Sequence, residues 1–149
     1  MTGADMYDVV LLALCAWREA QNQPKVAQIG QAWTVRNRVN TPHPAGHPLW
    51  WGEGYAGVIL RPFQYSSFNH NDPNAVKMPF QGDVAWQQCL EVAQDVYQGI
   101  TTDPTGGATH YFDSSLDSHP PNWATDGSME HVIDLGQFRF WRKAVTVKT

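Results

Sequence analysis

The first forty residues place their apolar side chains at helical spacing. Residues 5–21 predict a helix around the apolar run from Val9 to Trp17, and Asn22-Gln23-Pro24 ends it. Pro24 also suits the first turn of a second helix, which ends before Thr41-Pro42. Two helices should therefore meet at a tight corner just after residue 21.

A third helix is predicted between Asp83 and Gly99. Asp83 is a typical N-cap, apolar residues recur at helical spacing after it, and Gly99 is a typical C-terminal stop. The segments before this helix carry weaker patterns. Residues 42–56 are rich in Pro and Gly and predict an ordered loop, residues 57–60 predict one helical turn, and residues 69–82 predict exposed turns.

Alternation of apolar and polar residues indicates short extended segments. Residues 63–68 alternate in this way and predict a short strand or an extended loop, and residues 108–112 predict another. Residues 113–127 predict a loop. Residues 132–141 predict a hairpin whose turn is Gly136-Gln137.

These elements predict an α+β fold that is mainly α, with one small β-hairpin. A chain of 149 residues with 42% apolar residues and seven Trp suits a single domain with one core over residues 1–149. The net charge is −4, and the ten Lys and Arg are spread along the chain. This distribution gives no electrostatic footprint for nucleic acid.

No targeting or membrane segment is expected. Asp5 and Asp8 precede the apolar run where a signal peptide carries basic residues, and the run is too short to span a bilayer. We therefore expect synthesis in the cytoplasm without a signal peptide.

Glu19 is the first candidate for catalysis. On a helical period it shares a face with Leu12 and Cys15, so its carboxyl should lie beside apolar side chains. Burial raises the pKa of a carboxyl, which suits a group that delivers a proton to a leaving group, as the acid of a glycosidase does. The alternative is a solvated Glu that pairs with Arg18 or Arg36.

Two other kinds of catalytic site are weighed and not favoured. His43 and His47 are four residues apart, but the prolines around them exclude the helix that would make them converge, and Asp72, His70 and His119 lie in predicted loops. We predict no metal and no cofactor.

A thiol enzyme would use Cys15 with His110 as its base. A reactive thiolate usually begins a helix, whereas Cys15 lies deep inside one, so core packing is the better interpretation. Cys89 also lies in an apolar helical pattern, and a disulfide between the two cysteines is possible but not indicated.

Aromatic residues are dense in the predicted loops. Clefts for glycans combine aromatic platforms with amides such as Gln64 and Asn69. The alternative is that these rings fill the core of a loop-rich domain. The residues concerned are Trp50, Trp51, Tyr55, Tyr65, Tyr111 and Trp123.

Several motifs occur in the order found in one known family. They are Ala16-Trp17-Arg18-Glu19-Ala20, Val35-Arg36-Asn37-Arg38-Val39, Gly57-Val58-Ile59, Gln64-Tyr65-Ser66, the segment from Asp103 to Phe112, and Leu135-Gly136-Gln137-Phe138. Over about residues 9–142 the chain resembles the SleB-type cell wall hydrolases, which include the spore cortex-lytic enzymes.

This resemblance implies a lysozyme-like, mainly helical domain that is similar to lytic transglycosylases. Its single catalytic Glu, which corresponds to Glu19, would cleave the MurNAc to GlcNAc bond of peptidoglycan glycan strands. The resemblance also implies two substrate-binding segments that line a cleft beside Glu19. Their residues are Gln64, Tyr65 and Ser66 in the first, and Thr105, Gly107, His110 and Tyr111 in the second.

Two features depart from the family pattern. The family commonly has Gly-Glu-Ala-Arg around its acid, whereas this chain has Arg18-Glu19-Ala20-Gln21. On a helical wheel Arg18 points about 100° away from Glu19, so we expect it to miss the carboxylate. We expect no wall-binding module, and in this the domain is similar to a phage or prophage endolysin. We expect a monomer that another protein releases to the bacterial cell wall in the periplasm.

The mechanism has alternatives. In a transglycosylase the C6 hydroxyl of the substrate attacks, whereas a hydrolytic muramidase needs a second carboxylate. Asp72 and Asp113 are the nearest acids in order, but no motif marks either. A non-catalytic glycan-binding module or a structural part of a phage tail is a further alternative.

Overall fold

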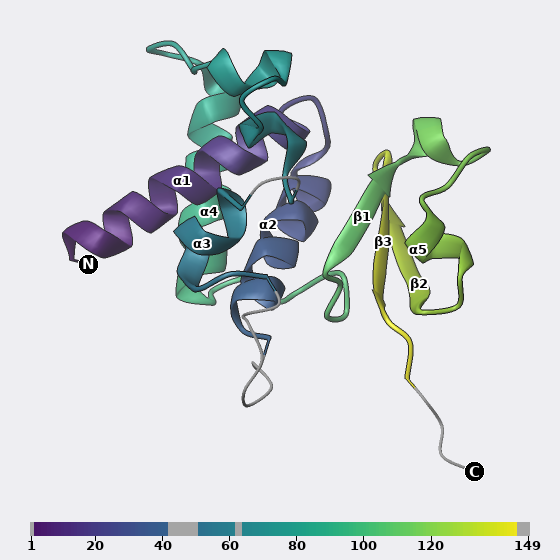
Figure 1. Cartoon of the computed structure of the whole chain (residues 1–149). Coiled ribbons are helices and arrows are strands. Elements are labelled where there is room, and N and C mark those ends of the chain that lie inside the picture. Colours follow the sequence, from purple (N-terminus) through teal and green to yellow (C-terminus); the bar gives the residue numbers. More distant parts are fainter. Residues whose placement is uncertain (1, 42–50, 62–63, 146–149) are drawn as a thin grey trace.

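Four helices form one side of the molecule and a small sheet forms the other (Figure 1). This computed structural model describes residues 2–41, 51–61 and 64–145. Among the described residues, none of the helices combines the length and the apolar character needed to cross a bilayer.

The three predicted long helices are confirmed. They are α1 (Gly3–Ala20), α2 (Lys25–Val39) and α4 (Val84–Gln98). As expected, the Asp83 side chain caps α4 by accepting from the backbone N–H of Trp86, and Gly99 ends it with a φ of 72°. The N-terminus of α1 begins earlier than predicted, because Thr2 and Asp5 form a capping box.

The short elements differ from the sequence prediction. Helix α3 (Gly54–Ile59) starts inside the segment predicted as loop. In the segment 63–68, predicted as a short strand or an extended loop, the described residues include η1 (Ser66–Phe68), a 3-10 helix, and η2 (Pro73–Val76) follows it. The predicted loop after residue 113 contains η3 (Ser114–Leu116) and α5 (Asn122–Thr125). Elements of three to six residues have too few positions to show a period.

The predicted hairpin is confirmed and gains a third strand. Strands β2 (Met129–Leu135) and β3 (Phe138–Lys143) pair antiparallel, and β1 (His110–Asp113) pairs with the other edge of β3, giving the order β1-β3-β2. Tyr111 lies opposite Phe140. We call this the inner face of the sheet, because Phe140 is buried against the helices.

The sheet approaches α2 closely at one glycine. A Cβ on Gly30 would lie 2.9 Å from Cζ of Phe140, closer than carbon atoms in contact come, and 3.1 Å from a methyl group of Leu135. Gly30 therefore lets the inner face of the sheet pack against the helix. The buried side chains that form the core between the sheet and the helices are Ala20, Ala27, Ala108, Phe138 and Phe140.

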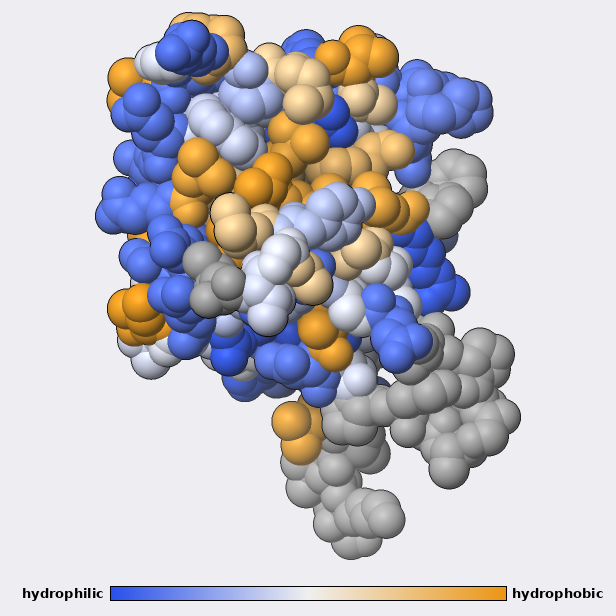
Figure 2. Space-filling view, turned by 90° about the vertical axis from the view of Figure 1, so that its left-hand side faces the viewer, coloured by the Kyte–Doolittle hydropathy of each residue, from blue (hydrophilic) through white to orange (hydrophobic). Residues whose placement is uncertain are grey.

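One face of the helical side carries apolar surface. Figure 2 shows apolar side chains gathered in the middle of that face, with polar ones around them. The exposed apolar residues of α1 are Met6, Tyr7 and Val10. The expected monomeric state stays a prediction.

Candidate active site

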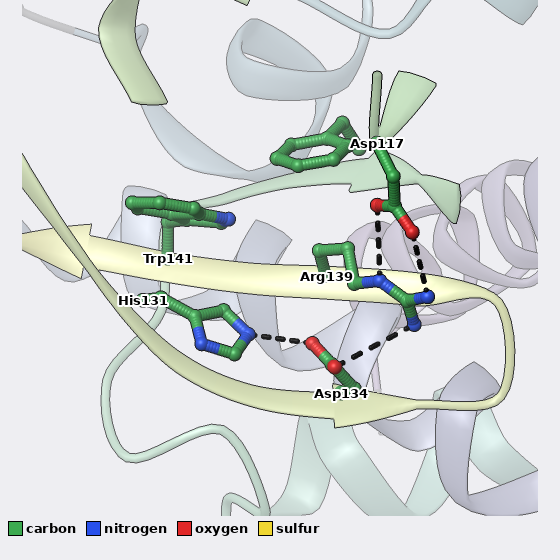
Figure 3. Close-up of a pocket in the computed structure, with 6 residues that line it drawn as sticks. Asp117, His131, Asp134, Arg139 and Trp141 are labelled. Carbon is green, nitrogen blue, oxygen red and sulfur yellow. Dashed lines mark hydrogen bonds and ion pairs between the residues drawn. The ribbon is translucent and has the colours of Figure 1, made fainter. Parts of the chain in front are cut away.

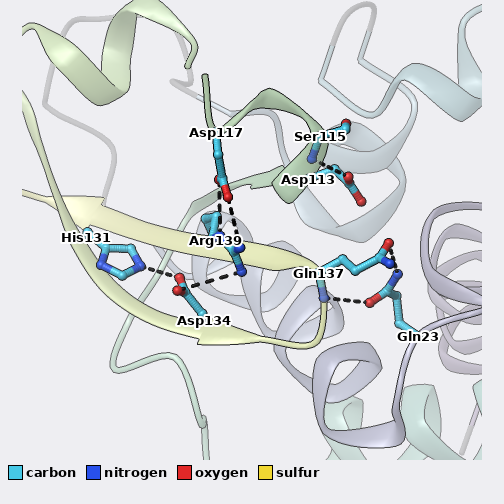
Figure 4. A network of polar contacts seen from close by, with 8 residues as sticks. All are labelled: Gln23, Asp113, Ser115, Asp117, His131, Asp134, Gln137 and Arg139. Carbon is cyan, nitrogen blue, oxygen red and sulfur yellow. Dashed lines mark hydrogen bonds and ion pairs between the residues drawn. The ribbon is translucent and has the colours of Figure 1, made fainter. Parts of the chain in front are cut away.

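The corner after Glu19 is fastened to the tip of the hairpin. Gln23 accepts from the backbone N–H of Gln137 over 2.9 Å and donates through Nε2 to Oε1 of the same residue over 3.2 Å (Figure 4). The φ of Gly136 is 55°, and a Cβ there would lie 2.9 Å from Cδ of Pro24, so a glycine fits this turn against the corner. These contacts hold the end of α1 against the sheet.

Glu19 is half-buried beside η1, and its carboxyl is held by one hydroxyl. Ser67 Oγ donates to Glu19 Oε1 over 3.1 Å, and Ser67 is only 1% exposed. Burial raises the pKa of Glu19 above its ordinary value, hydrogen bonds from Ser67 lower it, and the charge of Asp72 raises it. The helix dipole also disfavours a negative charge at the end of α1. The expected shielding of this carboxyl is confirmed.

Two tyrosine hydroxyls lie close enough to Glu19 to be affected by its charge. Burial is the main cause of the raised pKa of both Tyr65 and Tyr111, to about 12 for Tyr65, and the charge of Glu19 adds to each. The Tyr65 hydroxyl lies 3.3 Å from Oγ1 of Thr34, and the Tyr111 ring packs against Phe138. Both hydroxyls therefore keep their protons at neutral pH and can donate hydrogen bonds.

Arg18 does not pair with Glu19. Its Nε donates to the Lys77 carbonyl over 3.1 Å, its Nη1 to the Ser67 carbonyl over 3.4 Å, and its guanidinium lies over the Phe68 ring. The expectation that Arg18 misses the carboxylate is confirmed. Arg18 instead binds the segment that carries Ser67. It therefore helps to position Ser67, the hydrogen-bond partner of Glu19, without forming an ion pair with Glu19.

Two arginines of α2 hold other segments in place. Arg36 donates to backbone carbonyls at the end of α4 and does not pair with Glu19. The buried Arg38 donates to the Thr109 carbonyl over 2.6 Å and to Gln64 Oε1 over 2.8 Å. Arg38 therefore joins the start of β1 to the segment before η1. The sequence did not indicate this role, because a cation within a helix usually faces solvent.

Ser67, the residue that follows the predicted segment Gln64-Tyr65-Ser66, makes the contact with Glu19. In a strand, Ser66 would share a face with Gln64. Because η1 turns the chain at this point, Ser67 contacts Glu19 and Ser66 is exposed. Tyr65 is 2% exposed, so its side chain lies within the core.

Thr105 and Gly107 lie in a turn that starts β1. The Asp103 carboxylate accepts from the backbone N–H groups of Thr105 over 2.8 Å and Gly107 over 2.9 Å. Asn37 of α2 donates to that carboxylate and to the Ala108 carbonyl. Thr105 is 0% exposed, so its side chain has no surface for a glycan. Asp at the start of a Gly-rich turn signals this capping.

His110 faces away from Tyr111, because neighbouring residues of a strand point to opposite faces. Its ring packs against Trp51 and Trp123, with ring centroids 5.2 Å and 4.8 Å away. Burial, with the charge of Arg38, lowers the pKa of His110 to about 4, so the ring is neutral at neutral pH. The structure therefore does not bring His110 together with Glu19.

The predicted loop aromatics fall into two groups. Tyr55 and Tyr65 belong to the helical core, as the packing interpretation expected. Trp51 and Trp123 gather around His110 on the outer face of the sheet, which is the face opposite Tyr111. Trp50 lies outside the described residues.

The thiol and metal alternatives gain no support. Cys15 and Cys89 are free and buried, and burial raises the pKa of Cys15 well above its ordinary value, which disfavours a thiolate. The ranges that the structure describes contain no group of three or more His, Cys, Asp or Glu that could hold a metal ion. His43 and His47 lie outside those ranges.

Asp72 and Asp113, which were considered from the sequence as a possible second carboxylate, differ in the structure. The charge of Asp72 acts on the pKa of Glu19, and its carboxylate caps η2 by accepting from the backbone N–H of Asn74. Asp113 accepts from the backbone N–H of Ser115 (Figure 4). Asp72 is therefore the stronger candidate for a second carboxylate. The groove expected beside Glu19 stays a prediction.

Comparisons with known proteins agree with this architecture. A family model described as Cell Wall Hydrolase matches residues 22–141, a stretch that begins after Glu19. The fold matches the catalytic domain of the Bacillus cereus SleB protein at 23% identity and a TM-score of 0.66, over 92% of this chain and 91% of that one.

A second match is the catalytic domain of the germination-specific lytic transglycosylase SleB from Bacillus anthracis. The identity is 22% and the TM-score 0.67, over 95% of this chain and 99% of that one. A search of curated proteins by sequence gave no match. The expected mainly helical, lysozyme-like fold is thus confirmed.

Proposed function

The chain belongs to the Cell Wall Hydrolase family, and we propose that it cleaves the MurNAc to GlcNAc bond of peptidoglycan with Glu19 as its general acid. One observation carries the proposal: the half-buried Glu19 has a raised pKa and lies at the end of a helix, between η1 and the sheet. A carboxyl with a raised pKa holds its proton to a higher pH than an ordinary glutamate, and can donate it to a glycosidic oxygen.

The reaction that fits a single acid is that of a lytic transglycosylase, the activity named for the similar Bacillus anthracis domain. Glu19 gives its proton to the glycosidic oxygen as the bond to the muramyl C1 breaks. The C6 hydroxyl of the same sugar then attacks C1 and returns its proton to Glu19. The products are a 1,6-anhydro sugar and a chain with a new free hydroxyl, so no water is consumed.

Product mass tests the reaction type. Peptidoglycan digested by the protein should yield fragments that are lighter by one water than those from a hydrolytic muramidase. Fragments with the mass of hydrolysed glycan would replace the transglycosylase with the muramidase. If the protein binds purified wall but releases no fragment, this result would contradict both enzymatic reactions and favour a glycan-binding module.

The variant Asp72→Asn tests whether Asp72 is the second carboxylate that a muramidase would need. Asn can cap η2 as Asp does, so the segment should keep its shape. In a transglycosylase the variant keeps the anhydro product and most of its activity, while a muramidase that used Asp72 would lose about 10²–10⁴-fold. The measurement is the rate of wall solubilisation, with Asp113→Asn as the matched control.

Ser67→Ala should change the pH dependence. Glu19 must carry its proton to act as an acid, so activity falls as the pH rises through its pKa. The Ser67 hydroxyl stabilises the carboxylate, so its removal raises the pKa of Glu19 further. The basic limb of kcat/KM against pH should therefore move to higher pH. Ser66→Ala, one residue away and exposed, should leave the limb in place; a downward shift in Ser67→Ala would contradict this role.

A further inference from the structure

A pocket on the outer face of the sheet is built from side chains that the proposed reaction does not use. It is a shallow, open depression with a volume of about 300 Å³ (Figure 3). Pockets of this size sit at the lower end of those that hold small ligands, and suit a sugar ring better than a helix or a folded partner. The lining residues are Phe112, Asp117, His131, Asp134, Arg139 and Trp141.

The strand register explains how these residues come together. Trp141 of β3 lies between His110 of β1 and His131 of β2, and Arg139 likewise lies between Phe112 and Asp134. The two rows are two residues apart on β3, so both point to the outer face.

A β-bulge makes this possible on β2. Ile133 pairs with Phe140 on the inner face, while His131 and Asp134 pair with outer-face partners, and the register shifts between His131 and Ile133. Without the extra residue, His131 and Ile133 would point to the same face. The bulge re-aims His131 into the pocket, which is a common use of bulges beside binding sites.

The polar side of the pocket is ordered by ion pairs. Arg139 binds Asp117 through two nitrogens, at 3.0 and 3.2 Å, and lies 3.7 Å from Asp134 (Figures 3 and 4). Asp134 also contacts Nε2 of His131 at 2.5 Å, which leaves Nδ1 of that ring for a ligand. The two carboxylates and the guanidinium together carry a net charge of −1. This charge disfavours anionic ligands and favours a neutral one.

The apolar side presents aromatic rings. Trp141 packs near Phe112, Trp123 and His131, with ring centroids between 5.3 and 6.1 Å apart. Its indole N–H is buried and has no hydrogen-bond partner among the described residues. Buried donors without a partner are uncommon. A ligand with an apolar face and several hydroxyl or amide groups matches both sides of the pocket.

We propose that this pocket is a second glycan-binding site, which takes one N-acetylhexosamine unit of a wall glycan strand away from Glu19. The sugar ring stacks on Trp141, and its hydroxyl and acetamido groups bond to His131 and the Asp117–Arg139–Asp134 group. The choice of wall glycan rests on the proposed function. The site holds the enzyme on insoluble wall while Glu19 acts on a neighbouring stretch.

The test is an NMR titration of the Glu19→Gln protein with tri-N-acetylchitotriose, which supplies the sugar without wall peptides. The indole N–H signal of Trp141 and the amide signals of residues 131–134 should shift and saturate. His131→Ala removes one exposed hydrogen-bonding ring and should weaken binding about threefold to tenfold. The matched control is His70→Ala. His70 is exposed and is not among the residues that line the pocket.

Two results would overturn the second site: no shift of the Trp141 indole signal, or equal binding by the His131→Ala protein. Both are independent of the reaction at Glu19, since the titrated protein lacks that carboxyl. A His131→Ala enzyme with an intact Glu19 should bind sedimented wall less tightly but cleave soluble glycan fragments at the normal rate. Loss of cleavage on soluble fragments would instead place His131 in the catalytic step.

Discussion

Replacing Glu19 with Gln should lower the rate of peptidoglycan solubilisation by about 10²–10⁴-fold, the contribution of a general acid. Gln has the shape of Glu and can still accept the hydrogen bond from Ser67, but it has no proton to donate to a glycosidic oxygen. The assay is the release of soluble fragments from purified wall.

The matched control is Glu91→Gln. Glu91 lies on α4, its side chain is 60% exposed, and its pair with Lys25 is a surface ion pair of small energetic value. This variant should solubilise wall at the normal rate. If the Glu19→Gln protein also solubilised wall at the normal rate, with an unchanged circular dichroism spectrum, this would contradict both the transglycosylase and the muramidase mechanism.

Phe140→Ala should lower the free energy of unfolding by about 3–5 kcal/mol, because it leaves a cavity in the core. Phe140 is 0% exposed, packs against Tyr111 and occupies the space that Gly30 leaves on α2. Domains of this kind are commonly stable by only about 5–15 kcal/mol, so the loss is a large part of the total. The measurement is equilibrium unfolding in urea.

Phe80→Ala provides the comparison for the same change at the surface. Phe80 is 70% exposed, so its removal should change the free energy of unfolding by less than about 0.5 kcal/mol. Equal losses in the two variants would mean that the sheet does not pack on α2 as described.

The long helices could be predicted from sequence because their signals are local. Helix α4 shows this most clearly, since Asp83 caps it and Gly99 ends it where the sequence placed them. Segment 63–68 shows the limit. Its alternation indicated a short strand or an extended loop, but a strand forms only where it pairs with another strand, and Ser66–Phe68 form η1 instead. Alternation alone does not supply the pairing.

The candidate acid could be predicted from the sequence, whereas most of the residues that surround it could not. Glu19 could be identified because its helical face is readable from α1 itself. Ser67 could not, because its contact with Glu19 depends on η1 and on Arg18, which holds the segment by its carbonyl groups. The bulge that turns His131 outward likewise follows from strand pairing, which a single strand's sequence does not fix.

The central claim is that the surroundings of Glu19 keep its carboxyl protonated at a higher pH than an ordinary glutamate. An NMR titration that follows the carboxyl carbon of Glu19, assigned by comparison with Glu19→Gln, measures this directly. The account predicts a midpoint above the ordinary pKa of 4.5. A midpoint at or below that value would contradict it.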